Sequence, residues 1–245
     1  MRNLSTVTLL QLWEQGLHQR PVQQALLLLT AACPELTPAA VTQLTIGQRN
    51  RLLLQLRALT FGEQLAMQAT CPHCASELEM ACTVGDLFID NTTAQPAIFA
   101  FDVDGYQIGY RLPTSLDLAA LADCTAIAVA RAQLLTRCLV APHAADREGD
   151  GAQVPAEWRE RLILQMQQND PQADMQLTLV CPACGQGWQA AFDIVTFFWA
   201  EIAAWARRTL YDVHTLARAY GWREADILAL SPQRRQFYLE LQGAV

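Results

Sequence analysis

Cys71-Pro72-His73-Cys74 and Cys181-Pro182-Ala183-Cys184 are two copies of one short motif, Cys-Pro-X-Cys, and the rest of the chain is organised around them. A Cys-X-X-Cys turn holds two thiolates about as far apart as two corners of a zinc tetrahedron, so two turns supply a closed set of four ligands. Paired motifs usually lie about 15 to 20 residues apart. Here the 106 residues from 75 to 180 stand between them, so a shared site requires distant segments to meet.

The residues on both sides of each motif alternate between apolar and polar side chains, as β-strands do. The apolar positions are Leu65, Met67, Ala69, Leu78, Met80 and Cys82 around the first motif, and Met175, Leu177, Leu179, Trp188, Ala190 and Phe192 around the second. This pattern predicts two hairpins, over residues 63–84 and 174–193, with a cysteine turn at each tip. Because the hairpins match, we expect them to face each other and to hold one structural zinc ion through Cys71, Cys74, Cys181 and Cys184.

Two other interpretations of the motifs remain open. One is a redox dithiol, which the presence of two matched motifs and the lack of a thioredoxin-like βαβ pattern disfavour. The other is a pair of hairpins without metal. His73 lies inside the first motif and is able to replace a thiolate, but we expect it to be exposed. Four cysteine ligands leave no open position for water, so catalysis at the metal is disfavoured.

The first 62 residues show helical periodicity. One helix is expected from Thr6 to Leu17, with Gly16 as a left-handed cap, and a second begins at Pro21. Thr45 and Gln48 form a capping box that starts a third helix, which buries Leu52, Leu53, Leu56 and Leu59. Its other face carries Arg49, Arg51 and Arg57. We expect this to be a solvated face, with a contact to an acidic partner as the alternative.

An insertion of one further hairpin and several helices is predicted between the two cysteine hairpins, over residues 97–169. Asp104-Gly105 lies between alternating apolar residues, which indicates a type I′ turn with Val103 paired to Tyr106. One largely buried helix is expected from Leu116 to Leu139, and another from Pro155 to about Gln168. The polar composition of residues 141–154 predicts a mobile loop between these helices.

The last part of the chain, residues 194–245, is predicted to be entirely helical. A first helix capped by Asp193 is expected to end at Arg207-Arg208, and a second, capped by Asp212, to end at Gly221. Helices over 222–230 and 232–241 follow. The predicted fold class is therefore α+β, mainly helical, with a zinc-ribbon-like pair of β-hairpins. Its three regions are an N-terminal helical region (1–62), a zinc-ribbon-like region (63–193) and a C-terminal helical region (194–245).

Composition excludes several classes of function. The net charge of −7 argues against a general phosphate-binding surface, and the absence of lysine removes lysine-based catalysis and P-loop phosphate binding. The chain contains no H-E-x-x-H, G-x-S-x-G or G-x-G-x-x-G motif, and its four histidines (His18, His73, His143 and His214) are scattered. Apolar runs are too short for a membrane span, and no secretory signal is expected. In a reducing cytoplasm Cys33, Cys124 and Cys138 are expected to be small core residues.

Four segments resemble the baseplate proteins of contractile-tailed phages and related contractile injection particles. They are Leu44–Arg51, the Phe61-Gly62 step into the first cysteine motif, Tyr110–Thr114, and Tyr220–Pro232 with the following Arg234-Arg235. The resemblance implies a non-enzymatic component or assembly factor of the baseplate or its central hub. Its partners would be other baseplate, hub or tail proteins. The implied location is the bacterial cytoplasm during assembly, with the phage virion or injection particle as a further location.

Two functions of other classes stay open beside this one. A nucleic-acid-binding zinc ribbon needs arginines on the ribbon, but Glu77 and Glu79 follow the first motif and no arginine lies close to either motif. A thiol-disulfide oxidoreductase needs an accessible cysteine pair with a depressed thiol pKa. We therefore predict a protein without enzymatic activity whose zinc site is structural and which acts through protein contacts. Its C-terminal tryptophan, tyrosine and arginine residues are of the types enriched at protein interfaces, and the alternative is that the aromatic ones belong to the core.

Overall fold

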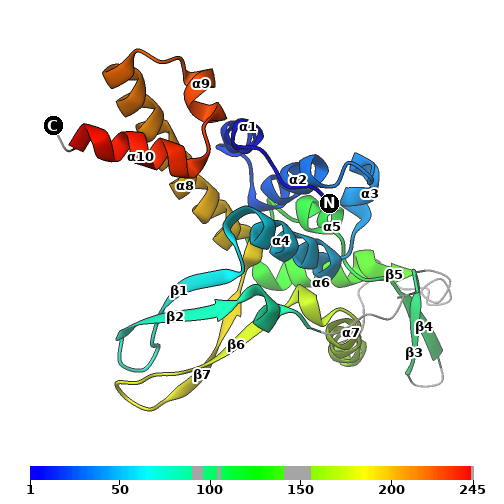
Figure 1. Ribbon diagram of the computed structural model, residues 1–245. Helices are drawn as coiled ribbons and strands as arrows, with labels where there is room; N and C mark the ends of the chain where they lie inside the picture. The colour runs from blue at the N-terminus through cyan, green and yellow to red at the C-terminus, as the bar shows by residue number, and fades with distance from the viewer. Residues whose placement is uncertain (90–95, 104–105, 141–155, 244–245) are drawn as a thin grey trace.

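The computed structural model describes residues 1–89, 96–103, 106–140 and 156–243, in which helices predominate and three small antiparallel sheets occur (Figure 1). The predicted fold class, mainly helical α+β, is confirmed. Helices α1 to α4, within residues 6–61, and the first part of α8 (Ile194–Tyr220) form the body of the protein. The two cysteine hairpins extend from this body side by side, and the C-terminal helices project from it in another direction, at the upper left of Figure 1. Within the described residues no helix is both long and apolar enough to span a bilayer.

Four helices begin the chain, and proline or a polar side chain starts each one. They are α1 (Thr6–Gly16), α2 (Pro21–Ala32), α3 (Pro38–Gln43) and α4 (Ile46–Phe61). The predicted capping box is confirmed: the Gln48 N–H donates to Thr45 Oγ1 (3.2 Å) and the Thr45 N–H donates to Gln48 Oε1 (3.0 Å). Leu9 and Leu12 of α1 and the buried leucines of α2 and α4 form one core with Ile194 and Phe198 of α8.

Gly16 has a different role from the one predicted. It does not adopt the left-handed conformation, and Leu17, which follows it, is right-handed. A β-carbon at position 16 would collide with the indole ring of Trp199 on α8. The prediction of a left-handed cap was therefore wrong, because the glycine serves the close approach of α1 to α8.

Both predicted cysteine hairpins are present. The first pairs β1 (Gln64–Thr70) with β2 (Glu77–Thr83), and the second pairs β6 (Met175–Val180) with β7 (Gly187–Phe192). Met67 pairs with Met80, and Leu177 with Ala190, so each hairpin has one apolar face. Short 3₁₀ helices at Val84–Leu87 and Pro171–Ala173 lead into and out of the insertion between the hairpins.

The inserted segment forms a second, smaller core. Strands β3 (Phe99–Val103) and β4 (Tyr106–Tyr110) pair with Val103 opposite Tyr106, as predicted, and β5 (Leu139–Val140) adds a third strand. Tyr110, which is 0% exposed, packs in this core with Leu112, Leu135 and Leu162 of α7 (Ala156–Asn169). The loop predicted over residues 141–154 lies outside the described residues.

The single buried helix predicted from Leu116 to Leu139 was wrong. The chain forms α5 (Ser115–Ala120) and α6 (Ile127–Cys138), separated by residues such as Asp123 and Thr125 that favour helices poorly. Asp123 instead accepts a hydrogen bond from Arg20 (2.5 Å). Most of α6 is on the surface, and Ile127 is 85% exposed. Alanine content alone did not indicate burial.

The predicted helix break near Arg208 was also wrong. One helix, α8, runs from Ile194 to Tyr220, and Gly221 ends it with φ +68°, as predicted. Its buried positions from Ile202 onward are Ile202, Ala206, Thr209, Val213 and Leu216, spaced three or four residues apart, so the buried stripe continues without a gap. Asp212 therefore lies inside the helix and does not cap one. Helices α9 (Glu224–Ala229) and α10 (Pro232–Gly243) fold back on its second half.

Candidate metal centre

The two cysteine turns have the same backbone structure. In the first, the Cys71 N–H donates to the carbonyl of Ser76 (2.9 Å) and the Ala75 N–H donates to the carbonyl of Cys71 (2.9 Å). In the second, Cys181 and the residues that follow it form the equivalent bonds, at 2.9 and 2.8 Å. Hydrogen bonds of the first cysteine therefore close the backbone around each motif in the same way.

The residue after the second cysteine of each turn has a positive φ angle. It is Gly185 (+72°) in the second turn and Ala75 (+59°) in the first. A left-handed conformation costs an L-residue about 1–2 kcal/mol, whereas glycine adopts it readily. The first turn is thus strained at Ala75.

We predict that Ala75→Gly raises the free energy of unfolding by about 0.5 kcal/mol. The relief of strain exceeds the extra chain entropy of glycine in the unfolded state, which is about 0.4–1 kcal/mol. Gly185→Ala is the matched control and should lower stability by about 1 kcal/mol. Urea unfolding of the three proteins measures both changes. A loss of stability in Ala75→Gly would contradict the assignment of strain.

The turns bring together the four cysteines that the sequence indicated. Cys71 Sγ lies 3.8 Å from Cys184 Sγ, and Cys74 Sγ lies 3.6 Å from Cys181 Sγ. All four sulfur atoms lie within 4.8 Å of one another. A tetrahedral zinc ion with Zn–S bonds of about 2.3 Å separates its sulfur ligands by about 3.8 Å. The donor set therefore fits zinc in number, in ligand type and in spacing.

Burial divides the four thiols into two pairs, and the two exposed thiols differ in pKa. Cys71 and Cys181 are 1% and 0% exposed, whereas Cys74 and Cys184 face solvent. Hydrogen bonding with Ser76, whose Oγ is 3.2 Å away, lowers the pKa of Cys74 to about 6. The backbone N–H of Gln186 lowers the pKa of Cys184, but desolvation and the neighbouring thiols outweigh it and raise this pKa to about 12. Four thiolates at this distance repel one another, so full ionisation requires a cation.

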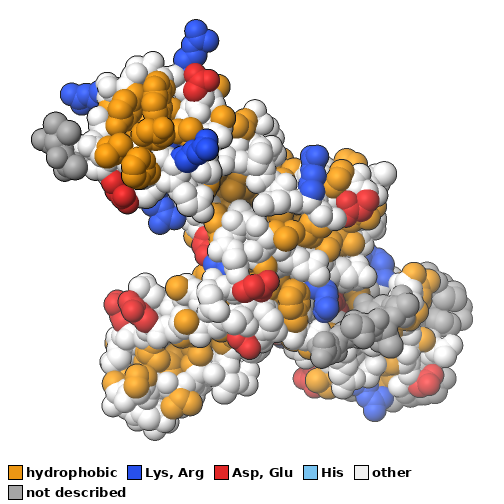
Figure 2. All heavy atoms as spheres, in the orientation of Figure 1, with side chains coloured by type: hydrophobic (Ala, Val, Ile, Leu, Met, Phe, Trp, Pro, Cys, Tyr) orange, Lys and Arg blue, Asp and Glu red, His pale blue; other side chains and the backbone are white. Residues whose placement is uncertain are grey.

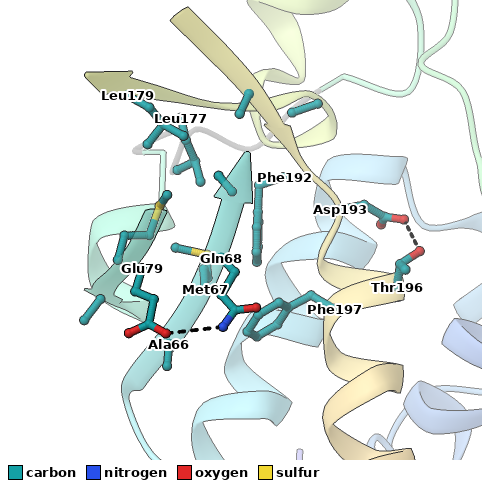
Figure 3. Close-up of a pocket in the computed structure, with 15 residues that line it drawn as sticks. Ala66, Met67, Gln68, Glu79, Leu177, Leu179, Phe192, Asp193, Thr196 and Phe197 are labelled. Atoms are coloured by element: carbon teal, nitrogen blue, oxygen red, sulfur yellow. Dashed lines mark hydrogen bonds between the residues drawn. The ribbon is translucent and has the colours of Figure 1, made fainter. Parts of the chain in front are cut away.

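A groove of about 830 Å³ lies between the hairpins. Met67, Met80, Leu177, Leu179 and Phe192 of the strands line it, together with Phe197 of α8. Figure 3 shows Met67 and Gln68 on one side of the groove and Leu177 and Leu179 on the other. The side chain of Glu79 accepts a hydrogen bond from Gln68 (3.5 Å), and Asp193 accepts one from Thr196 (2.6 Å). The groove is apolar and has carboxylates at its borders.

The base of the first hairpin is anchored by Arg57, which is only 3% exposed. Arg57 donates from Nε and Nη2 to the two carboxylate oxygens of Glu201 on α8 (2.8 and 2.6 Å). Its Nη1 donates to the carbonyls of Gly62 (2.7 Å) and Gln64 (2.6 Å), where α4 passes into β1. One side chain therefore connects α4, the first hairpin and α8.

The solvated arginine face predicted for α4 was wrong. Arg49 is 5% exposed and donates to the side-chain oxygen of Asn50 (3.1 and 2.8 Å). Burial lowers the pKa of its guanidinium, and the charges of Asp193 and Asp170 oppose this effect. Asp170 also accepts the Gly47 N–H (2.9 Å) and so fixes the start of α4. Arg57 thus pairs with a carboxylate of the same chain, whereas Arg51 donates to the carbonyl of Ile89 (3.4 Å).

The remaining predicted residues lie away from the centre. Cys33 and Cys138 are buried, as predicted, and Cys124 is half-buried. His18, His73 and His214 are exposed, and none belongs to the cysteine cluster found within the described residues; His143 lies outside those residues. The structural role of Glu201 was not predicted, because sequence periodicity does not indicate that Glu201 contacts Arg57, 144 positions away.

Comparison with known proteins adds one finding to this geometry. The family model described as T4 bacteriophage base plate protein matches residues 8–199, more than three quarters of the chain. The match includes α4, both hairpins, all four clustered cysteines and the beginning of α8. No curated protein and no solved structure matches the chain. Because the match spans both cysteine motifs and the segment between them, the chain belongs to the T4 bacteriophage base plate protein family.

Proposed function

We propose that the protein is a non-enzymatic structural or assembly component of a contractile phage-tail-like baseplate or hub and acts through protein–protein contacts. Membership of the base plate family carries this proposal. The chain would work in the bacterial cytoplasm during assembly and remain in the finished particle. The chain would consist of an N-terminal helical region (1–62), a zinc-ribbon-like region (63–193) and a C-terminal helical region (194–245).

Cys71, Cys74, Cys181 and Cys184 would hold a structural zinc ion. The sulfur spacing supports this assignment, because the separations of 3.6 and 3.8 Å are close to the value of about 3.8 Å between the sulfur ligands of tetrahedral zinc. The ion would cross-link two hairpin tips that are far apart in the sequence and would supply the cation that four neighbouring thiolates need. All four positions of the shell are occupied by protein, so the site contributes stability and no reaction.

The groove between the hairpins would be one contact surface with another baseplate protein. Its apolar lining suits an apolar segment of the partner. The charge of the hairpins indicates which residues should flank that segment. Residues 63–84 and 174–193 contain five acidic residues (Glu63, Glu77, Glu79, Asp174 and Asp193) and no arginine or lysine. Figure 2 shows acidic and apolar side chains over the hairpin end of the molecule. The partner would therefore be an apolar segment flanked by basic residues.

Metal analysis of the purified protein together with binding to its baseplate partners tests the proposal. We expect one zinc ion per chain by elemental analysis and native mass spectrometry, and loss of partner binding when a strong chelator removes it. The reference is the same protein reloaded with zinc, which should bind again. A metal-free preparation that binds its partners equally well would remove the zinc centre from the proposal.

The same preparation tests the two alternatives. Salt-sensitive binding of DNA in a gel shift would support a nucleic-acid-binding zinc ribbon, although the hairpins contain no arginine or lysine. Alkylation of Cys74 and Cys184 at equal rates with and without a chelator would support a free dithiol and a thiol-disulfide oxidoreductase. For a zinc centre, we expect protection of all four cysteines until the chelator is added.

A further inference from the structure

A second cavity, of about 550 Å³, lies far from the hairpins, between the middle of α8 and the start of α10. Arg207, Arg208 and Asp212 of α8 line it, together with Arg235 of α10. All residues that line it, Thr6 included, fall outside the 8–199 match to the base plate family. This cavity is therefore a feature of the present chain that the family match does not account for.

Arg235 is the unusual residue of this cavity. It is 4% exposed, and its Nη1 is buried without a hydrogen-bond partner among the described residues. Buried guanidinium groups are normally paired, because an uncompensated charge is costly to remove from water. Arg57 illustrates the usual case in the same protein, since its Nη1 donates to two carbonyls and its Nε and Nη2 to a carboxylate. Arg235 has a donor that requires an acceptor.

The surroundings of Arg235 favour an anion. Arg207 and Arg208 add two positive charges to the cavity, and the start of α10 contributes the positive end of the helix dipole. Asp212 is the acidic residue of the lining. Its pKa is raised by burial, which Arg235 and Arg208 oppose through their charges. The whole segment 203–245 contains six arginines and four acidic residues, whereas the net charge of the chain is −7. Figure 2 shows arginine side chains around this end of the molecule.

We infer that this cavity binds a carboxylate from an acidic segment of a partner protein, with Arg235 as the buried fork that receives it. A carboxylate fits better than a phosphate dianion, because Asp212 repels a second negative charge inside the cavity. Trp205 lines the same cavity, and Tyr211 beside it is 71% exposed, so the partner's neighbouring apolar atoms have aromatic surface to contact. The inference rests on the proposed function for the nature of the partner, which is another baseplate protein.

Titration with two matched peptides tests the inference in the intact protein. The probes are acetyl-alanyl-glutamyl-alanine amide and its glutaminyl counterpart, and the observable is the indole N–H resonance of Trp205. We expect saturable shifts with the glutamyl peptide and none with the glutaminyl peptide. Arg235→Gln should weaken binding by roughly tenfold or more, because it removes the charge-assisted pair. Arg234→Gln removes the same charge from an exposed neighbour outside the cavity and should change binding less than about twofold.

Several results would overturn the inference. Equal shifts with both peptides, or equal losses in Arg234→Gln and Arg235→Gln, would mean that no specific carboxylate site exists. Displacement of the peptide by inorganic phosphate at lower concentration would make it a phosphate site. A dimer in sedimentation that dissociates in Arg235→Gln would identify the occupant as a second copy of the chain. Should Arg235→Gln fail to fold, Arg208→Gln replaces it and must weaken binding more than Arg234→Gln does.

The result of the peptide titration is independent of the measurements that test the proposed function. The peptide probes involve neither a metal ion nor a baseplate protein, so their failure leaves the zinc measurement and the partner binding of the hairpins unaffected. Conversely, a metal-free protein that still binds the glutamyl peptide would refute the zinc centre and retain the carboxylate site.

Discussion

Cys181→Ser is expected to abolish zinc binding and to unfold both hairpins while the helical body stays folded. Cys181 is 0% exposed and its sulfur lies 3.6 Å from that of Cys74, so serine leaves a poor ligand in the buried half of the cluster. Structural zinc contributes about 10–16 kcal/mol in zinc-finger peptides. That range is an upper bound here, because the bases of the hairpins already share the main core through Leu65 and Met175.

Hydrogen exchange and zinc analysis measure this effect together. In Cys181→Ser the amides of β1, β2, β6 and β7 should lose protection, and the zinc content should fall from one per chain to none. Cys124→Ser is the control, because Cys124 is half-buried and lies outside the cluster. The wild-type protein treated with a chelator should reproduce the mutant. An unchanged thermal transition and unchanged protection in Cys181→Ser would contradict the role assigned to the cysteines.

Arg57→Met is expected to lower the free energy of unfolding by about 3–5 kcal/mol. The substitution leaves Glu201 without its cation and leaves the carbonyls of Gly62 and Gln64 without a donor. Methionine retains much of the apolar stem, so the loss reflects the guanidinium and not an empty space. Because the arginine connects α4 and the first hairpin to α8, the hairpin should also become more susceptible to proteolysis.

A double-mutant cycle separates the ion pair from the carbonyl contacts. Arg57→Met, Glu201→Gln and the double mutant are compared by urea unfolding, with a coupling energy of about 1–3 kcal/mol expected between the two positions. Arg51→Met is the matched control. Arg51 lies on the same helix but is half-buried, with its guanidinium 4.9 Å from the ring of Phe88, so its loss should cost about 1 kcal/mol or less. Equal losses at positions 51 and 57 would contradict the structural role of the pair.

Local sequence patterns predicted the hairpins well because strands and turns depend on residue types only a few positions apart. The alternation of apolar and polar residues correctly predicted both cysteine hairpins, and Asp104-Gly105 correctly indicated that Val103 pairs with Tyr106. The capping box at Thr45 and the left-handed Gly221 were equally local. Failures occurred where neighbours in space decide the outcome. Gly16 is small because Trp199 lies against it, a contact that no pattern around residue 16 records.

The sequence by itself determined the two hairpins, the mainly helical α+β class and the identity of the four candidate ligands, because each follows from residue types a few positions apart. Only the tertiary structure decided that Cys71 meets Cys184 and Cys74 meets Cys181, and that Arg57 pairs with Glu201. It also decided that Nη1 of Arg235 is buried with no hydrogen-bond partner in the part of the chain that the structure describes. These contacts join segments that are distant in the chain or depend on how α8 and α10 pack. Burial and charge pairing are properties of that packing, and side-chain periodicity reports only which face of an element is apolar.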